Sequence, residues 1–413
     1  MRPTVALIAL SALVAPAIAQ GADSVSIDAL EAQGLGSTKV ATLVELLPRE
    51  LPAQLTAAEI AEFTRRVKNL ALFDAVKVEV VGRVLRVTVR RKASISPIVD
   101  FSSGKTLADS KVTLGAIEND VDGRGTRLGA KASYNQRGLN FAVWLNQHPY
   151  GPRRWMNEAE VYYLGSSFRF EPASPDKWHR NRFGGFLEFL SPFVYGSRLR
   201  YEVQAEVYRE TYSGIGEASR VPRPGTYVGG LSELIWDAYT WNDLTPNGLR
   251  WSVELRPGVF LGAAQPRHEV RGKVLGAIKL GTQSVFVGLA QAAAVNGGNV
   301  NHSLLVGSQS GVRGLADSLY RAERFATLNL ELRHALSLGN RWYLQGVFFT
   351  DAARFQPMDA LGNRASTIHA INTGVGVRIL PTALVDTLLR FDVARLHAPD
   401  RAWFLQFGIS QYI

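Results

Sequence analysis

Residues 198–208 read RLRYEVQAEVY, in which apolar and polar side chains alternate without a break. One face of an extended chain would carry Leu199, Tyr201, Val203, Ala205 and Val207, and the other would carry arginine, glutamate and glutamine. Successive side chains of a β-strand point to opposite faces, so this stretch predicts a strand with one apolar and one charged face. In a soluble sandwich the apolar face of such a strand points into the core, and in a membrane barrel it points outward to lipid. One strand therefore does not decide between the two folds.

The same alternation recurs through the second part of the chain, at Leu128–Ala132, Trp251–Arg256, Val270–Val274 and Phe325–Leu336. We count about sixteen strands from residue 95 to residue 413, at about twenty residues for each strand with its loop. The longest run without charge, residues 280–312, is interrupted by polar residues and glycines, so it is not a spanning helix. Any membrane crossing must then be made by strands of a closed sheet. The sequence predicts an all-β transmembrane barrel of sixteen antiparallel strands over residues 95–413.

The N-terminus has the pattern of a secretory signal peptide. Arg2 precedes an apolar run from Val5 to Val14, and Ala17-Ile18-Ala19 forms a small-x-small cleavage site before Gln20. Residues 1–19 are therefore expected to be removed.

The chain has no cysteine, which excludes disulfides and thiolate metal sites, and its formal charge of +10 favours anionic surfaces such as lipid headgroups. No basic helix or stacking-aromatic motif points to a nucleic acid partner.

Residues 20–93 have an ordinary α+β composition. A short strand is expected at Ser24–Gly34 and a helix at Ser37–Leu47, which ends at Pro48. Thr56-Ala57-Ala58-Glu59 is a capping box that begins a second helix. Two alternating segments around Gly82-Arg83 predict a closing hairpin, Val76–Val81 with Val84–Arg90.

That order of elements, with Asn69-Leu70-Ala71-Leu72-Phe73-Asp74-Ala75-Val76 leading into the hairpin, resembles a POTRA domain of outer-membrane assembly and secretion barrels. The resemblance implies a periplasmic domain over residues 20–93 whose sheet edge, at Val76, Val78 and Val80, binds an incoming polypeptide through main-chain hydrogen bonds. A domain that only spaces or gates the barrel is the alternative.

One loop between alternating segments reads Ser310-Gly311-Val312-Arg313-Gly314-Leu315. Gly311 and Gly314 allow the backbone to turn tightly on either side of Arg313. A guanidinium keeps its charge and matches a carboxylate, so an inward-pointing Arg313 needs an acidic partner, and Glu331 and Asp351 follow within forty residues. The alternative is a solvated loop charge.

The last predicted strand ends at the C-terminus, and it must pair with the first strand, near Phe101, to close the barrel. Gly408 weakens side-chain packing at that seam, which would favour sideways opening. The residues assigned to this last strand and its seam are Trp403, Leu405, Phe407, Gly408, Ile409, Tyr412 and Ile413, and the family resemblance described below implies that they also carry a terminal assembly signal.

Taken together, these parts resemble the BamA/TamA-type family of bacterial outer-membrane assembly and secretion barrels, as a short member with one POTRA domain. In that family an outer loop folds into the barrel, and its arginine contacts carboxylates of the inner wall. The resemblance places Val312, Arg313, Gly314 and Leu315 in that loop motif, and Glu331 and Asp351 as the partners of the arginine. Further matches are Gly374–Arg378 with Phe391–Ala394, the turn Asn119–Gly125, and the terminal Gln406–Ile409.

The resemblance implies outer-membrane protein assembly or polypeptide translocation, with the N-terminal domain in the periplasm. The expected partners are unfolded outer-membrane or secreted polypeptides, outer-membrane lipid and lipopolysaccharide, with periplasmic chaperones or accessory lipoproteins as further candidates. The sequence contains no nucleophile elbow, Walker loop or paired-histidine metal motif, so no catalysis, cofactor or metal is expected. A passive outer-membrane channel or structural barrel, gated by the N-terminal domain, is the alternative function.

Overall fold

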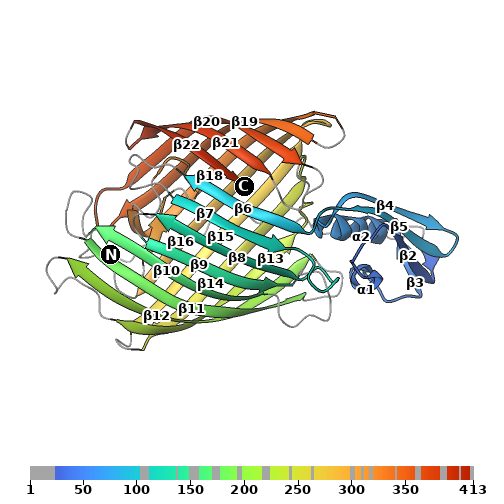
Figure 1. Cartoon of the computed structure of the whole chain (residues 1–413), viewed down its shortest axis with the longest axis horizontal. Helices are drawn as coiled ribbons and strands as arrows, with labels where there is room; N and C mark the ends of the chain where they lie inside the picture. Colours follow the sequence, from blue (N-terminus) through green and yellow to red (C-terminus); the bar gives the residue numbers. More distant parts are fainter. Residues whose placement is uncertain are drawn as a thin grey trace, which may run out of the picture.

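The fold is taken from a computed structural model of the whole chain, which consists of an N-terminal module beside one end of a β-barrel (Figure 1). The structure describes residues 24–102, 111–135, 138–147, 158–169, 177–192, 198–215, 224–240, 244–261, 265–297, 303–307, 311–315, 320–339, 342–358, 364–381, 388–399 and 401–409. The expected signal peptide, Tyr412 and Ile413 lie outside these residues.

The N-terminal module contains two short helices and two small sheets. Its elements are β1 (Ser24–Ile27), β2 (Ala29–Gln33), α1 (Val40–Val44), β3 (Ala53–Thr56), α2 (Ala57–Asn69), β4 (Phe73–Val81) and β5 (Val84–Arg91). One sheet pairs β1 with β3, and the other has the order β2-β5-β4, with β2 parallel to β5. The expected first strand is thus two strands, the expected first helix is shorter, and β3 is an addition.

Helix α2 begins where the capping box predicts. The Glu59 amide donates to Oγ1 of Thr56 at 3.2 Å, and the Thr56 amide donates to Oε2 of Glu59 at 2.8 Å. The apolar face of the helix places Phe63 and Val67 in the core of the module, where both side chains are fully shielded from solvent. Since the cap satisfies amides that have no partner within the helix, the position of this helix is fixed by the local sequence.

The barrel is a closed antiparallel sheet, and it confirms the predicted count of sixteen strands. In chain order its strands are β6 (Ile95–Ser102), β7 (Lys111–Glu118), β8 (Arg127–Asn135), β9 (Gly138–Asn146), β10 (Glu158–Arg169), β11 (Lys177–Pro192), β12 (Leu199–Ile215), β13 (Gly225–Asp237), β14 (Gly248–Phe260), β15 (Gln265–Lys279), β16 (Ser284–Gly297), β18 (Tyr320–Ser337), β19 (Trp342–Pro357), β20 (Ile368–Pro381), β21 (Leu389–Ala398) and β22 (Ala402–Ile409). The short β17 (Leu304–Val306) pairs with β18 beyond the end of β16. It therefore continues the position of β16 in the sheet and does not add a seventeenth strand to the barrel.

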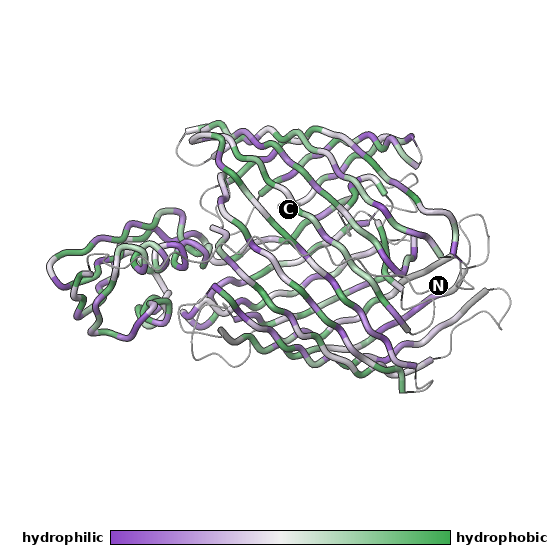
Figure 2. Tube along the Cα trace, turned by 180° about the vertical axis from the view of Figure 1, so that it is seen from behind, coloured by the Kyte–Doolittle hydropathy of each residue, from purple (hydrophilic) through white to green (hydrophobic). Residues whose placement is uncertain are grey.

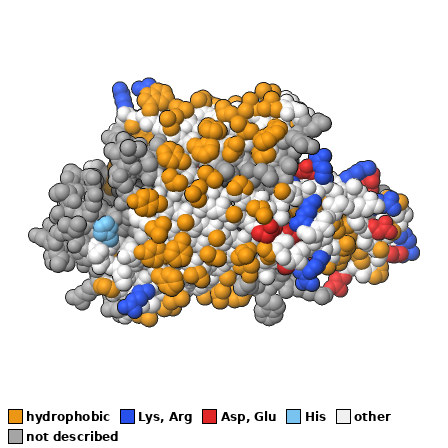
Figure 3. All heavy atoms as spheres, viewed as in Figure 1, with side chains coloured by type: hydrophobic (Ala, Val, Ile, Leu, Met, Phe, Trp, Pro, Cys, Tyr) orange, Lys and Arg blue, Asp and Glu red, His pale blue; other side chains and the backbone are white. Residues whose placement is uncertain are grey.

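Hydrophobic and hydrophilic residues alternate along the strands of the barrel (Figure 2). The exposure of their side chains separates the outside of the barrel from its interior, the lumen. On β12 the outward Val203 and Val207 are 41% and 52% exposed, whereas the inward Arg200 and Gln204 are 5% and 6% exposed. Hydrophobic side chains cover the visible outer surface, with few charges among them (Figure 3). Apolar side chains outside and polar ones inside are the arrangement of a membrane-spanning barrel. Within the described residues, no helix is long and apolar enough to cross a bilayer.

The module contacts the turns at the adjacent end of the barrel. The Thr38 hydroxyl donates to Asp120 at 2.7 Å, and the Lys39 amide donates to the Gly123 carbonyl at 2.7 Å. On another turn, Arg65 and Asn69 of α2 donate to the Tyr239 carbonyl at 2.9 and 3.1 Å. Since these partners lie before β8 and after β13, the module is held at two separate points of the rim.

Candidate functional site

The candidate site is built around residues 311–315, which lie in the lumen against the wall made by β18 and β19. The backbone turns sharply there, with φ of +104° at Gly311 and +93° at Gly314. These angles are in the left-handed region that glycine adopts with little strain. The two glycines thus bend the chain on either side of Arg313.

Arg313 is 1% exposed, and two carboxylates of the wall bind its guanidinium. Nε and Nη2 donate to Oδ2 and Oδ1 of Asp351 at 2.8 and 2.7 Å, which is a bidentate pair. Nη1 donates to Oε1 of Glu331 at 2.7 Å. The guanidinium also lies 3.5 Å above the ring of Phe349. We call Arg313, Glu331 and Asp351 the arginine clasp.

Two asparagines, Asn329 on β18 and Asn372 on β20, complete the clasp from the two sides of β19. Asn329 Nδ2 donates to the Gly311 carbonyl and, at 2.8 Å, to Oδ1 of Asp351. Asn372 Nδ2 donates to the Arg313 carbonyl and, at 3.0 Å, to Oδ2 of Asp351. Both asparagines are fully buried, and each ties the loop backbone to the same carboxylate. The loop is therefore held by its main chain as well as by its charge.

Further charges extend the clasp along the lumen wall. Arg333 donates to Oε2 of Glu331 at 2.7 Å, and Arg378 pairs with Asp392. Gly376 leaves the space for this pair, because a β-carbon there would lie 2.0 Å from Oδ1 of Asp392. A buried ion pair needs well-placed partners to offset the loss of hydration, and the alternating signs provide them.

The apolar residues of the loop pack toward the last strand. Val312 and Leu315 are buried in a cluster that includes Phe355 and Phe404. Gly314 lies directly against Phe404, where a β-carbon would be 2.6 Å from Cδ2 of the ring. The loop therefore contacts β22, which is one of the two strands that close the barrel.

A second segment enters the lumen from the end near the module. It is the turn between β13 and β14, whose Tyr239 is 1% exposed and packs against Val285 and Val287. The Leu244 carbonyl of the same turn accepts a hydrogen bond from Gln345 of β19 at 3.0 Å. Since α2 of the module holds the Tyr239 carbonyl, the module is connected to the lumen through this turn.

The seam between β22 and β6 has three described pairs, from Gln406 with Ser102 to Gly408 with Asp100. A β-carbon on Gly408 would lie 2.6 Å from Oδ1 of Asp100, so the glycine leaves room for that carboxylate. Trp403 and Leu405 point outward and are 69% and 63% exposed.

The structure thus brings together Val312, Arg313, Gly314, Leu315, Glu331 and Asp351, and it places Phe407 opposite Phe101 at the seam. The sequence reading did not assign Asn329 and Asn372 to the site. A signal was present for Asn329, which is an inward polar residue two positions before Glu331. The proposed edge residues Val76, Val78 and Val80 lie on β4 at the edge of the module sheet; Val76 and Val78 pack toward the core, and Val80 is 37% exposed.

Among the described residues, no group of three or more histidine or acidic side chains could hold a metal ion.

No protein-family model matches the sequence, and no curated protein matches it either. Solved structures share the fold. CdiB from Escherichia coli aligns with a TM-score of 0.65 at 12% identity, over 93% of this chain and 76% of that chain. CdiB from Acinetobacter baumannii gives 0.59 at 14% identity, over 93% and 73%. BamA from Haemophilus ducreyi lacking POTRA domains 1–3 gives 0.54 at 13% identity, over 94% and 84%.

Proposed function

We propose that the protein resides in the bacterial outer membrane and inserts polypeptides into that membrane or translocates them across it. The observation that carries the proposal is the contact of the clasped loop with the last strand, through Gly314 and Phe404, because that strand is one of the two that meet at the seam. A loop that supports one side of the seam can hold it closed, and release of the loop would leave β22 with less support. The whole-chain likeness to the BamA and CdiB folds supports the same function.

The energy for this function would come from strand pairing. An opened seam exposes unpaired amides and carbonyls of β6 and β22, and a client strand that pairs with them replaces the lost hydrogen bonds. Each such bond contributes about 0.5–1.5 kcal/mol net, so holding a client requires a run of paired residues along the strand and not a single contact.

In this proposal the N-terminal module is a POTRA domain that faces the periplasm. Among the described residues, its strand β4 pairs only with β5, which leaves its other backbone edge to receive an extended polypeptide. The module also reaches the lumen through the Tyr239 turn, which gives a route from a captured client to the barrel wall.

Locking the seam tests the proposal. The chain has no native cysteine, and Phe101 and Phe407 are opposite each other, so F101C/F407C places one disulfide across the seam. The control F391C/F407C joins β22 to β21, where the two residues are also opposite each other. In a strain without the native protein, oxidised F101C/F407C should fail to complement the transport defect, reduction should restore it, and the control should complement in both states. Full complementation by the locked seam would show that the seam does not open.

A passive channel is the competing function, and conductance separates the two. Chain segments enter the lumen from both ends, at residues 311–315 and at the Tyr239 turn, which opposes free passage. In planar bilayers we therefore expect low and intermittent conductance. A large, steady conductance that does not change when residues 24–91 are removed would favour the channel.

A further inference from the structure

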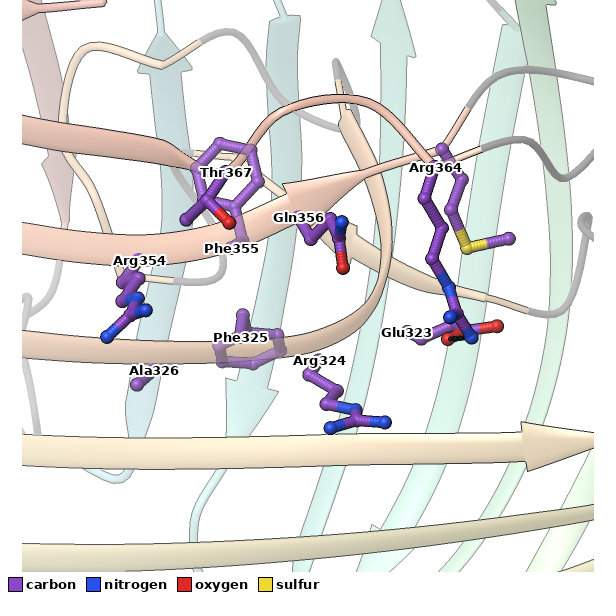
Figure 4. Close-up of a pocket in the computed structure, with 10 residues that line it drawn as sticks. Glu323, Arg324, Phe325, Ala326, Arg354, Phe355, Gln356, Arg364 and Thr367 are labelled. Atoms are coloured by element: carbon purple, nitrogen blue, oxygen red, sulfur yellow. Dashed lines mark hydrogen bonds and ion pairs between the residues drawn. The ribbon is translucent and has the colours of Figure 1, made fainter. Parts of the chain in front are cut away.

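A pocket of about 270 Å³ lies at the end of the barrel far from the module, between β18, β19 and the segment that precedes β20 (Figure 4). Three arginines line it, Arg324, Arg354 and Arg364, together with Glu323. None of these residues belongs to the arginine clasp. The pocket therefore needs an explanation of its own.

Two of these arginines point away from the lumen. On β18, Arg324 is exposed and shares the outward face with Leu328 and Leu332, which are 43% and 45% exposed. On β19, Arg354 shares the outward face with Phe348, which is 56% exposed. Since residues two apart in a strand lie on the same face, both arginines stand at the rim of the surface that contacts lipid.

The two outward arginines are unpaired in the described part of the chain. Arg364 holds Glu323 at 2.6 Å, so that acid is already engaged. Arg324 and Arg354 have no hydrogen bond or ion pair with any described residue, and the small Ala326, which is opposite Arg354 in the sheet, leaves space between them. Basic side chains also gather at the upper left of Figure 3, over the ends of β19 and β20 that are farthest from the module.

We propose that this pocket binds the phosphate of an anionic glycolipid in the outer leaflet of the membrane. The guanidinium groups of Arg324 and Arg354 would donate to the phosphate oxygens, which match the planar fork of arginine. The acyl chains would lie along Leu328, Leu332 and Phe348, on the same faces of the two strands. Basic residues at a membrane rim attract anionic headgroups in this way.

This inference rests on the proposed placement in an outer membrane, but not on polypeptide transport. Its location also gives the lipid a role, because β18 supplies Glu331 of the clasp from its opposite face. A lipid bound to β18 and β19 would hold the two clasp strands together from outside.

Native mass spectrometry of the full-length protein in detergent tests the site, with diphosphoryl lipid A as the probe. The variant R324Q/R354Q should bind lipid A at least about tenfold more weakly than the wild type, because two charge-assisted contacts are lost. The control R395Q removes an exposed arginine of β21 outside the pocket and should bind as the wild type does. A heat-modifiability gel shows whether each variant keeps its barrel.

Two further probes identify the ligand. Dephosphorylated lipid A should bind the wild type about as weakly as lipid A binds R324Q/R354Q, and inorganic phosphate alone should not compete at millimolar concentration. Equal binding of lipid A by R324Q/R354Q and wild type, or an equal loss in R395Q, would overturn the site. Equal binding of phosphatidylglycerol vesicles and lipid A would overturn the glycolipid assignment. These binding measurements do not depend on polypeptide transport. Their result therefore remains valid even if the locked seam of F101C/F407C complements fully and the proposed transport function is wrong.

Discussion

Gly314 of the lumenal loop lies against the ring of Phe404 on the last strand, so close that a β-carbon on the glycine would be 2.6 Å from Cδ2 of the phenylalanine. This contact joins the arginine clasp to the seam. Phe404 lies two residues before Gln406, which pairs with Ser102 of β6, so the clasp in the lumen is connected to the strand that closes the barrel.

Replacing Gly314 with alanine should weaken the closed barrel. The residue has φ of +93°, which costs a residue with a side chain about 1–3 kcal/mol, and the new methyl group must also displace Phe404. We expect G314A to unfold at a lower temperature in a heat-modifiability gel. The control is G272A, because a β-carbon on Gly272 of β15 meets nothing within 4 Å. Equal melting of the two variants would contradict the close contact.

Replacing Arg313 with alanine leaves Glu331 and Asp351 buried without their shared partner. Breaking a buried pair in this way costs about 3–5 kcal/mol, so R313A should lower the unfolding temperature of the barrel more than any surface change. R313K keeps the charge but loses the bidentate contact with Asp351, and we expect an intermediate value. The control is R83A in the module, whose ion pair with Asp28 is exposed. An R313A barrel as stable as the R83A barrel would mean that the clasp does not hold the loop.

The sequence predicted the barrel because alternation is a local property of each strand. Val203 and Val207 point outward and Arg200 and Gln204 point inward, as the period of two requires. The prediction that the apolar face points outward, unlike in a soluble protein, came from the signal-peptide pattern and the number of strands. No single strand could decide it.

The clasp was only partly predictable, because its members meet through the register of the sheet. Glu331 and Asp351 were candidates because the charge of Arg313 needs an acidic partner, and the family resemblance assigned both to it. Asn372 joins them because it is opposite Asp351 on β20, and nothing within its own strand indicates that pairing. The contact of Leu244 with Gln345 joins residues 101 positions apart, and it depends on the turn between β13 and β14, which enters the lumen. Periodicity fixes which face a residue lies on, but register decides its neighbours.

Docking of the module should weaken in acid because of Glu62 on α2. Burial alone would raise the pKa of this carboxyl, but hydrogen bonds and charge from Arg65 and Arg66 outweigh burial and lower the pKa below its ordinary value of 4.5. A carboxyl with a lowered pKa stabilises the folded state above its ordinary pKa, and that contribution is lost as the pH falls through the lowered value. Arg65 also donates to the Tyr239 carbonyl of the barrel, so protonation of Glu62 should loosen the contact between module and barrel.

Hydrogen exchange of α2 measures this effect. Below pH 4.5, protection of residues 57–69 in the wild type should fall toward that of E62Q, while at pH 7 the wild type should be better protected than E62Q. Comparing the two proteins at each pH removes the intrinsic dependence of exchange on acidity. A constant difference between them from pH 7 to pH 3 would show that Glu62 does not control the contact.

The free edge of β4 provides the final prediction, which concerns capture of the client. In the order β2-β5-β4 each outer strand has one edge without a partner strand in the described part of the chain, but β4 has nine residues and β2 has five. The longer edge offers more main-chain hydrogen bonds to an extended polypeptide. A photocrosslinking residue at Val80, which is 37% exposed, should therefore capture an unfolded outer-membrane polypeptide added to the purified protein. The matched position is Glu31, an exposed residue of β2, which should capture little. Equal capture at both positions would mean that the client does not add to β4, and the module would then only space or gate the barrel.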